Sequence, residues 1–251
     1  MEEQNGIQHY FINSHLLKDE VSSAQYEREG LIVLEKEFKN KDTIILVGGS
    51  GMFIDALCIG LDKIPSSPSL RKEIQKEYNE NGLDLLLEEL KRKDPEYFAE
   101  VDKKNSVRII RAIEVIRFSG KKYSELRIST PKNRPFTVHR FVLNHEREKL
   151  YTRINNRVES MVTQGLVDEA MSVKHLETLS SLNTVGYKEL FSYFDGTISL
   201  AEAIDQIKQN TRRYAKRQIT WFKRHKDATW INFESAEQVC KEIIEKINPF
   251  I

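Results

Sequence analysis

The sequence predicts an α/β core that is interrupted by an all-helical insert at about residues 66–135. Three observations support this fold class. A β-branched run at 43–47 ends in a Gly-Gly-Ser-Gly bend, a second β-like run follows at 137–143, and apolar residues recur with helical spacing between 70 and 122. Alternation of strands with helices favours a parallel sheet, whose ligands bind where the strands end.

The first part of the chain predicts a helix, a buried strand and a second helix. Residues 21–38 have helical apolar spacing, and Ser22 or Ser23 can cap their start. The run 43–47 is short and continuously apolar, as expected of a strand buried in a parallel sheet. Backbone N–H groups at the following bend favour anions, and Ser50 adds a hydroxyl there. Glycine pairs also occur in such bends for packing alone, so the motif by itself is weak.

The insert is marked by proline-rich breaks at 62–69 and 130–135. Between them, two apolar stripes repeat with the spacing of one helix face. Their members are Leu83, Leu86, Leu87 and Leu90 in the first stripe and Ile109, Ile110, Ile113 and Ile116 in the second. Pro95 is expected to interrupt the helices and Gly120 to end the last one. We therefore divide the chain into a core of residues 1–65 and 136–251 and an insert of residues 66–135.

Composition excludes several classes of function. The net charge is +1, so no global field favours nucleic acid, and any basic site must be local. The two cysteines lack a C-x-x-C pattern and the six histidines lack metal-ligand spacing, so neither a disulfide nor a metal site is expected. No apolar run reaches the about 18 residues of a membrane span. The polar N-terminal residues do not resemble a signal peptide, so a cytoplasmic protein is expected.

A long helix near the C-terminus carries the clearest charge pattern. Ser199-x-x-Glu202 is a capping box that predicts its start, and the helix runs toward Lys226. One face is mainly apolar; its predicted members are Ile204, Ile207, Thr211, Tyr214, Gln218, Trp221 and Phe222. The other face carries six cations and no acid: Arg212, Arg213, Lys216, Arg217, Lys223 and Arg224. Such charges usually form a solvated helix surface. Here, however, the apolar face anchors the helix and no acid neutralises the cations, which favours binding of an oligoanion such as a diphosphate or a nucleic-acid backbone.

Two weaker features accompany this ridge. Arg108 and Arg111 are neighbours on one predicted helix, where Glu114 can partly neutralise them. The loop 183–188 contains Gly186, which permits close backbone approach, and Tyr187, which can stack on a base or be buried as an ordinary core residue. Spacing alone leaves both interpretations of Tyr187 open.

Several segments together resemble the bacterial tRNA dimethylallyltransferase family, also called tRNA isopentenylpyrophosphate transferase. They occur in the family's order and cover most of the chain. The matching segments are GIQHYFIN (6–13), LVGGSGMFIDAL (46–57), RIIRAIEVIRFSGK (108–121), NTVGYKEL (183–190) and TRRYAKRQITWFKR (211–224). The last of these is the most specific.

The resemblance implies a P-loop NTPase-like core with a helical insert that contacts tRNA. It implies transfer of a dimethylallyl group from dimethylallyl diphosphate to N6 of the adenosine 3′ of the anticodon. Ser50 stands at the family's Thr/Ser position and is expected to orient the amine. Arg212, Lys216 and Arg217 are expected to bind the diphosphate, with Mg²⁺ as the helper ion and no metal site built from protein ligands alone.

The resemblance also implies a set of tRNA contacts for a monomer that binds the anticodon stem-loop. The positions that match the family's tRNA-binding residues are Ser50, Arg71, Arg108, Arg111, Gly186, Tyr187 and Lys188. The target base must leave its stack to reach a buried diphosphate, which fits a channel between core and insert.

The chain departs from the family in two motifs. Neither the phosphate loop G-x-T-x-x-G-K-[ST] nor the S-x-D-S-x-Q segment with its general-base Asp occurs in it. We therefore expect an N-terminally truncated chain, shortened artificially or in nature, that is inactive or severely impaired. Two alternatives remain: a non-catalytic tRNA- or RNA-binding protein, and an adenylate isopentenyltransferase, which resembles the chain around the bend and the arginine-rich helix but lacks the insert. A nucleotide kinase is a weaker alternative, because its reaction depends even more on the missing phosphate loop.

Overall fold

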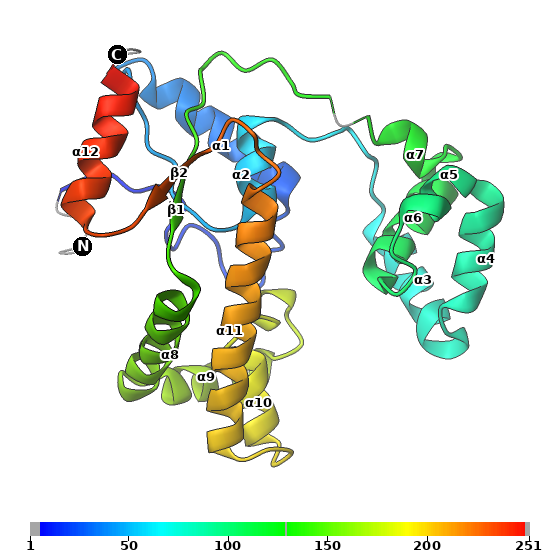
Figure 1. The fold of residues 1–251 in the computed structure, drawn as a ribbon. Coiled ribbons are helices and arrows are strands. Elements are labelled where there is room, and N and C mark those ends of the chain that lie inside the picture. Colours follow the sequence, from blue (N-terminus) through cyan, green and yellow to red (C-terminus); the bar gives the residue numbers. More distant parts are fainter. Residues whose placement is uncertain (1–5, 129, 249–251) are drawn as a thin grey trace. The chain divides into compact units, whose positions relative to one another are not determined.

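The computed structural model describes residues 6–128 and 130–248, and the chain divides into two compact units (Figure 1). The core unit comprises Met1–Cys58 and Pro135–Ile251, and the helical unit comprises Ile59–Arg134. The insert predicted from the sequence spans residues 66–135. Each unit is described below by itself.

The helical unit is built around α6, in which six of the eight apolar residues are buried. Its helices are α3 (Pro68–Asn81), α4 (Asp84–Lys93), α5 (Pro95–Glu100), α6 (Ser106–Ser119) and α7 (Tyr123–Leu126). The side chain of Asn105 caps the start of α6, and Gly120 ends it in the left-handed conformation, φ +70°. Ile109 and Ile113 of α6 belong to the buried apolar cluster of this unit, and α6 packs against α3 and α4. The predicted apolar stripe of α6 is thus the centre of this unit's core.

Two polar anchors join the helices of this unit. Arg117 of α6 forms ion pairs with Glu77 of α3 at 2.8 Å and with Glu89 of α4 at 2.6 Å. Asp94, which is fully buried, caps α5 through the N–H of Tyr97 and accepts the N–H and hydroxyl of Ser124. Because every one of these buried charges has partners, the anchors fix how the helices pack without an unpaired charge.

The core unit contains a two-stranded parallel sheet and seven α-helices among the residues that the structure describes. The strands are β1 (Phe141–Asn144) and β2 (Thr229–Asn232), with Phe141 opposite Thr229. The helices are α1 (Ser23–Glu37), α2 (Gly51–Cys58), α8 (Arg147–Thr163), α9 (Leu166–Val173), α10 (Tyr187–Phe194), α11 (Leu200–Phe222) and α12 (Ala236–Ile247). Two short 3₁₀ turns, η2 (Lys174–Leu176) and η3 (Ser180–Leu182), lie between α9 and α10. The predicted α/β fold class is confirmed.

The strand predicted at 43–47 is wrong. These residues follow α1 as irregular chain, and the side chains of Ile45 and Val47 are 83% and 87% exposed. A β-strand needs a hydrogen-bonded neighbour, and among the described residues β1 and β2 pair only with each other. Apolar, β-branched composition therefore did not suffice to form a strand here.

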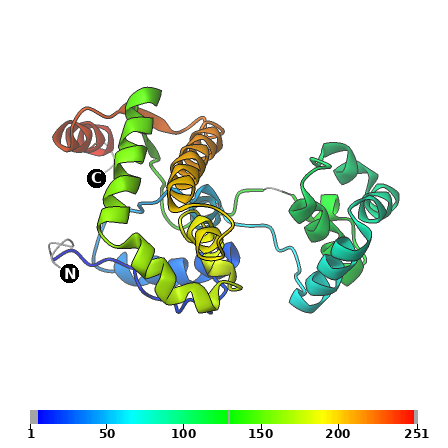
Figure 2. The ribbon, with the colours of Figure 1, turned by 90° about the horizontal axis from the view of Figure 1, so that it is seen from below.

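Helices α8, α9, α10 and α11 pack together in the core unit, as both views show (Figures 1 and 2). Val158 of α8, Leu190 of α10 and Ile207 of α11 meet in their shared apolar cluster. The predicted capping box at the start of α11 is present, because Ser199 accepts the N–H of Glu202 and the Glu202 carboxylate accepts the N–H of Ser199. This packing anchors the N-terminal half of the long helix.

Candidate substrate-binding site

The Gly-Ser-Gly bend lies directly against α11. Gln218 donates a hydrogen bond to the carbonyl oxygen of Gly49 at 2.9 Å, and a Cβ atom at Gly51 would overlap the indole ring of Trp221. Both glycines therefore leave room for a side chain of α11 directly against the bend: Gln218 at Gly49 and Trp221 at Gly51. Ser50 is exposed, and its carbonyl oxygen accepts the N–H groups of residues 53 and 54 at the start of α2.

A cluster around Asp55 holds the C-terminal end of α11 in place. The Asp55 carboxylate accepts the indole N–H of Trp221 at 2.8 Å and lies 3.1 Å from Nε2 of His225. Arg140, which precedes β1, approaches Asp55 at 3.7 Å and Asp227 at 3.0 Å. The Asp55 carboxylate of α2 is thus contacted from α11, from the turn that follows it and from the residue before β1. These contacts fix the bend, α11 and β1 relative to one another.

A surface pocket of about 410 Å³ opens beside this cluster, at the beginning of both strands. Its lining residues are Val138, His139, Arg140, Phe141, Asp227, Thr229 and Lys246. Neither Ser50 nor the expected diphosphate ligands of α11 line it. This pocket is therefore not the site that the sequence predicted.

Arg212 is held between α11 and α8. Its guanidinium group donates a hydrogen bond to Oδ1 of Asn155 at 2.6 Å and lies over the ring of Tyr151. Arg147 lies over the same ring and donates a hydrogen bond to the Tyr151 hydroxyl. Two cations therefore share one aromatic ring, which positions both of them through cation–π contacts. Sequence reasoning missed Arg147 and Tyr151, although their spacing of four residues places them on one helix face.

The other five cations of the predicted cationic face are exposed, three on α11 and two just after its last residue, Phe222, whereas Lys208, nearer the start of α11, pairs with Glu159 at 2.9 Å. The five are Arg213, Lys216, Arg217, Lys223 and Arg224, and in the part of the chain that the structure describes no carboxylate forms an ion pair with them or with Arg212. Arg224 stacks on the Trp221 ring at 3.8 Å, which brings a cation next to the bend. Tyr214 was predicted on the apolar face, but it is 42% exposed, and Arg217 lies over its ring.

The loop 183–188 is tied to α11 through a buried glutamate. Glu189 is 3% exposed; its carboxylate accepts the N–H of Gly186 at 2.8 Å and the side-chain amide of Asn210 at 2.7 Å. Asn210 in turn accepts a hydrogen bond from Arg213. Gly186 has φ +109°, a conformation that favours glycine. The loop and Arg213 of α11 therefore belong to one hydrogen-bonded network.

Tyr187 and Lys188 differ in their surroundings. The Tyr187 hydroxyl donates a hydrogen bond to Glu169 at 2.6 Å, and this bond raises the pKa of Tyr187 to about 12. Its ring is half-buried and packs near Phe191. Lys188 is exposed. The geometry favours a structural role for Tyr187 and leaves Lys188 accessible.

We expect Glu189→Gln to loosen this loop. The amide retains one acceptor but points an NH₂ group at a donor, which costs about 1–3 kcal/mol at a buried site. Hydrogen exchange at the Gly186 N–H should accelerate by at least about tenfold. The matched control is Glu202→Gln, which alters an equivalent but exposed capping contact and should change exchange near Ser199 much less. Unchanged exchange at Gly186 in Glu189→Gln would contradict the role given to this carboxylate.

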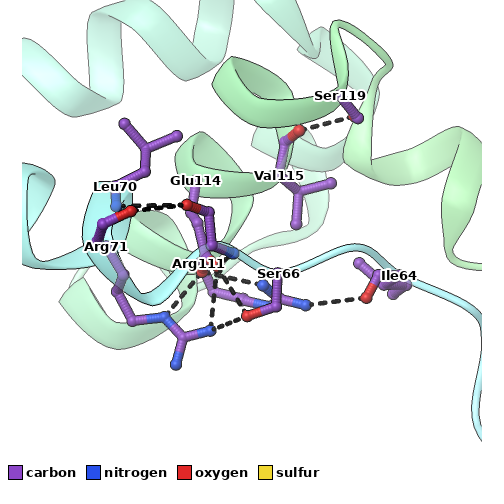
Figure 3. A network of polar contacts seen from close by, with 10 residues as sticks. Ile64, Ser66, Leu70, Arg71, Arg111, Glu114, Val115 and Ser119 are labelled. Atoms are coloured by element: carbon purple, nitrogen blue, oxygen red, sulfur yellow. Dashed lines mark hydrogen bonds and ion pairs between the residues drawn. The ribbon is translucent and has the colours of Figure 1, made fainter.

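The three predicted tRNA-binding arginines belong to the helical unit. Arg71 of α3 and Arg111 of α6 both pair with the buried carboxylate of Glu114, and Figure 3 shows the contacts converging there. Arg108 is exposed on the preceding turn of α6. Glu114 therefore neutralises Arg111, as its spacing allowed, and also binds Arg71, which the sequence did not indicate.

The structure brings together some of the predicted site residues. The bend meets α11, Arg212 meets α8, and the loop 183–188 meets Asn210. It shows no hydrogen bond between Ser50 and the cations of α11 among the described residues. The contacts that hold the bend come instead from Gln218 and Trp221, which the sequence placed on the inner face.

Two kinds of feature were not found in the described ranges 6–128 and 130–248. One is a group of three or more His, Cys, Asp or Glu side chains arranged to hold a metal ion. The other is a helix whose length and apolar character would let it cross a membrane.

Comparison with known proteins gives consistent matches over most of the chain. The family model described as IPP transferase matches residues 1–225. The tRNA dimethylallyltransferase 1 of Phocaeicola vulgatus is 45% identical over 238 residues, which cover 94% of this chain and 79% of that protein. The tRNA dimethylallyltransferase of Cytophaga hutchinsonii is 40% identical over 233 residues, which cover 92% and 77%.

Solved structures agree with this result. The full-length tRNA isopentenylpyrophosphate transferase of Bacillus halodurans superposes with a TM-score of 0.68 at 31% identity, covering 99% of this chain and 80% of that one. A eukaryotic dimethylallyltransferase acting on tRNA has a TM-score of 0.79 at 21% identity over 100% of this chain and 67% of that one, which supports the fold. With a family model that spans nine tenths of its length and relatives of this identity, the chain belongs to the IPP transferase family.

Proposed function

We propose that this chain takes part in transfer of a dimethylallyl group from dimethylallyl diphosphate to N6 of the adenosine 3′ of the anticodon in tRNA. Its relatives carry the name tRNA dimethylallyltransferase. The observation that carries the proposal is the run of six cations from Arg212 to Arg224, on the C-terminal part of α11 and just after it. These six lack carboxylate partners among the described residues, while the helix itself is packed against the bend.

Each proposed role follows from the charge changes of the reaction. An N–C bond forms, the C–O bond to the diphosphate breaks, and negative charge develops on the leaving oxygen. Arg212, Lys216 and Arg217 would stabilise that charge, and Ser50 would orient the amine. Arg212 is already fixed by Asn155, which reduces the entropy lost on binding an anion. Mg²⁺ would accompany the diphosphate, but the described residues form no three-ligand cluster for it, so no step is derived through the ion.

The proposed tRNA contacts are distributed over both units. Arg71, Arg108 and Arg111 lie in the helical unit, and Ser50, Gly186, Tyr187 and Lys188 lie in the core unit. We propose the anticodon stem-loop as the RNA element, because sequence-specific proteins bind single-stranded loops whose bases can be unstacked. We also propose that the protein acts as a monomer in the cytoplasm.

We expect the 251-residue chain to bind unmodified anticodon stem-loop RNA and to transfer little or no dimethylallyl group. The sequence lacks the phosphate loop and the general-base segment, so the diphosphate loses its backbone cradle and the amine its base. Binding should weaken steeply with salt, because arginines at phosphates release counterions. Fluorescence anisotropy measures the binding, and incorporation of labelled dimethylallyl measures the transfer.

The outcomes separate this proposal from its alternatives. Turnover close to that of a full-length relative would show that the chain is not impaired. Protection from proteolysis by AMP but not by tRNA would favour an adenylate isopentenyltransferase. A third outcome is that the chain binds RNA but still transfers no dimethylallyl group after the missing catalytic segment has been fused to it. That outcome would favour a non-catalytic binding protein.

A further inference from the structure

One carboxylate of the helical unit, that of Glu114, is fully buried and receives five contacts from hydroxyl, N–H and guanidinium groups. The Glu114 side chain is 0% exposed. It accepts hydrogen bonds from the hydroxyl of Ser66 at 3.0 Å, from the N–H of Ser67 at 2.8 Å, and from Nε and Nη2 of Arg71 at 2.8 and 3.2 Å. Arg111 approaches it at 2.9 Å. We call these five residues the Glu114 cluster (Figure 3).

The Glu114 cluster hides its anion and exposes its cations. Arg71 is 48% exposed, and Arg111, whose Nη1 is buried against the carboxylate, is 26% exposed, so both arginines remain partly accessible around one buried anion. The neighbouring anchor has the opposite composition, because Arg117 is surrounded by the carboxylates of Glu77 and Glu89. Of these two networks of described residues, the Glu114 cluster is the one with more cations than carboxylates.

The cluster also fixes the orientation of both guanidinium groups. Arg71 uses Nε and Nη2 on Glu114 and the hydroxyl of Ser66, which leaves its Nη1 without a partner among the described residues. Arg111 donates from Nη2 to the carbonyl oxygen of Ile64 at 3.4 Å. The planar fork of an arginine held in this way retains N–H donors that can bind a phosphate oxygen without losing further side-chain entropy.

From this geometry we infer that Glu114 is a positioning residue, which orients Arg71 and Arg111 for contact with RNA phosphates. The inference rests on the proposed function, since it takes tRNA as the partner of these arginines. Glu114 itself is buried and acts only through the two guanidinium groups.

Positioning and simple charge predict opposite results when Glu114 is neutralised. If only charge matters, Glu114→Gln makes the surface more positive and RNA binds more tightly. If orientation matters, the glutamine amide keeps one acceptor but turns an NH₂ group toward the arginine donors, and RNA binds more weakly despite the added net charge. The sign of the change therefore discriminates between the two.

The test measures binding of anticodon stem-loop RNA to the full chain by fluorescence anisotropy over a range of salt concentrations. We expect Glu114→Gln to weaken binding about tenfold and to lower the slope of log Kd against log salt by about 1 to 2. In an Arg71→Ala/Arg111→Ala background the same substitution should leave RNA affinity unchanged, because the groups through which it acts are gone. Binding by Glu114→Gln that is equal or tighter would overturn the inference.

A charge-conserving substitution keeps the test decisive if Glu114→Gln does not fold. Arg111→Lys retains the cation but loses the planar fork, so we expect RNA affinity to fall at least about threefold. Arg92→Lys is the matched control, since Arg92 is an exposed arginine of the same unit outside the Glu114 cluster. Equal affinities of Arg111→Lys and Arg92→Lys would overturn the inference. If the unaltered chain fails to bind RNA, the proposed function itself is wrong, which distinguishes the two failures.

Discussion

Lowering the pH toward 2 should unfold the helical unit before it disrupts the core unit. Hydrogen bonds from Arg117 hold the pKa of Glu89 at about 2, below the ordinary 4.5. Burial alone would raise the pKa of Glu114, but bonds from Arg71 and Arg111 outweigh it and also hold the value at about 2. The folded state therefore favours the charged form of both carboxylates more than the unfolded state does.

The sign of this effect follows from those values. Because the folded pKa lies below the unfolded one, the stabilisation is fully present above about pH 4.5 and is lost as the pH falls through about 2. Each carboxylate contributes at most roughly 3 kcal/mol, so losing both removes up to about 6 kcal/mol, which is comparable to the stability of a small domain. Amide signals of α6 in an NMR pH titration report on this unit.

The controls use residues of both units. The two tryptophans, Trp221 and Trp230, lie in the core unit, so their fluorescence reports on that unit during the same titration. Glu80→Gln alters an exposed carboxylate paired with Lys76 and should leave the acid midpoint of α6 unchanged. Glu89→Gln should flatten the acid transition. An acid midpoint that is the same with and without Glu89 would contradict this account.

Replacing Gly51 with alanine should destabilise the core unit by about 3 kcal/mol, as overpacking of a close contact does. The added Cβ would overlap the Trp221 ring, which cannot retreat without breaking its hydrogen bond to Asp55. The bend and α11 would then separate, and with them the contact on which the proposed site depends. Urea denaturation followed by tryptophan fluorescence measures the loss.

Gly48→Ala is the matched control for this substitution. Its Cβ would meet only the Ile54 side chain at 3.9 Å, an ordinary contact distance. We therefore expect a change of less than about 0.5 kcal/mol. Similar losses in both variants would show that the backbone of the bend, and not the Trp221 contact, determines the requirement for glycine.

Local signals in the sequence predicted most of the helices. The capping box at Ser199 marks the start of α11, and Gly120 marks the end of α6. These signals work because a cap and the residues it serves are neighbours in the chain, so the contact is fixed by sequence spacing. The apolar stripe of α6 is likewise a property of one helix and was predicted together with its burial.

Predictions that depended on partners elsewhere in the chain were less successful. The run 43–47 has the composition of a strand, but none of the described residues pairs with it. Tyr214 has an aromatic ring at an expected inner position, yet its side chain is exposed and Arg217 lies over the ring. In both cases, spacing along the chain does not say which surface the neighbouring elements leave open.

For this protein, the sequence by itself determined the α/β class and the long capped helix. It also determined that the stretch from Arg212 to Arg224 contains six cations and no acidic residue. Only the tertiary structure decided what those cations and the arginines of the helical unit contact. Arg212 meets Asn155, the bend meets Trp221, and Arg71 meets Glu114, although each pair is far apart in the sequence. The physical reason is that a charge pattern belongs to one helix, whereas the orientation of each side chain depends on packing against another.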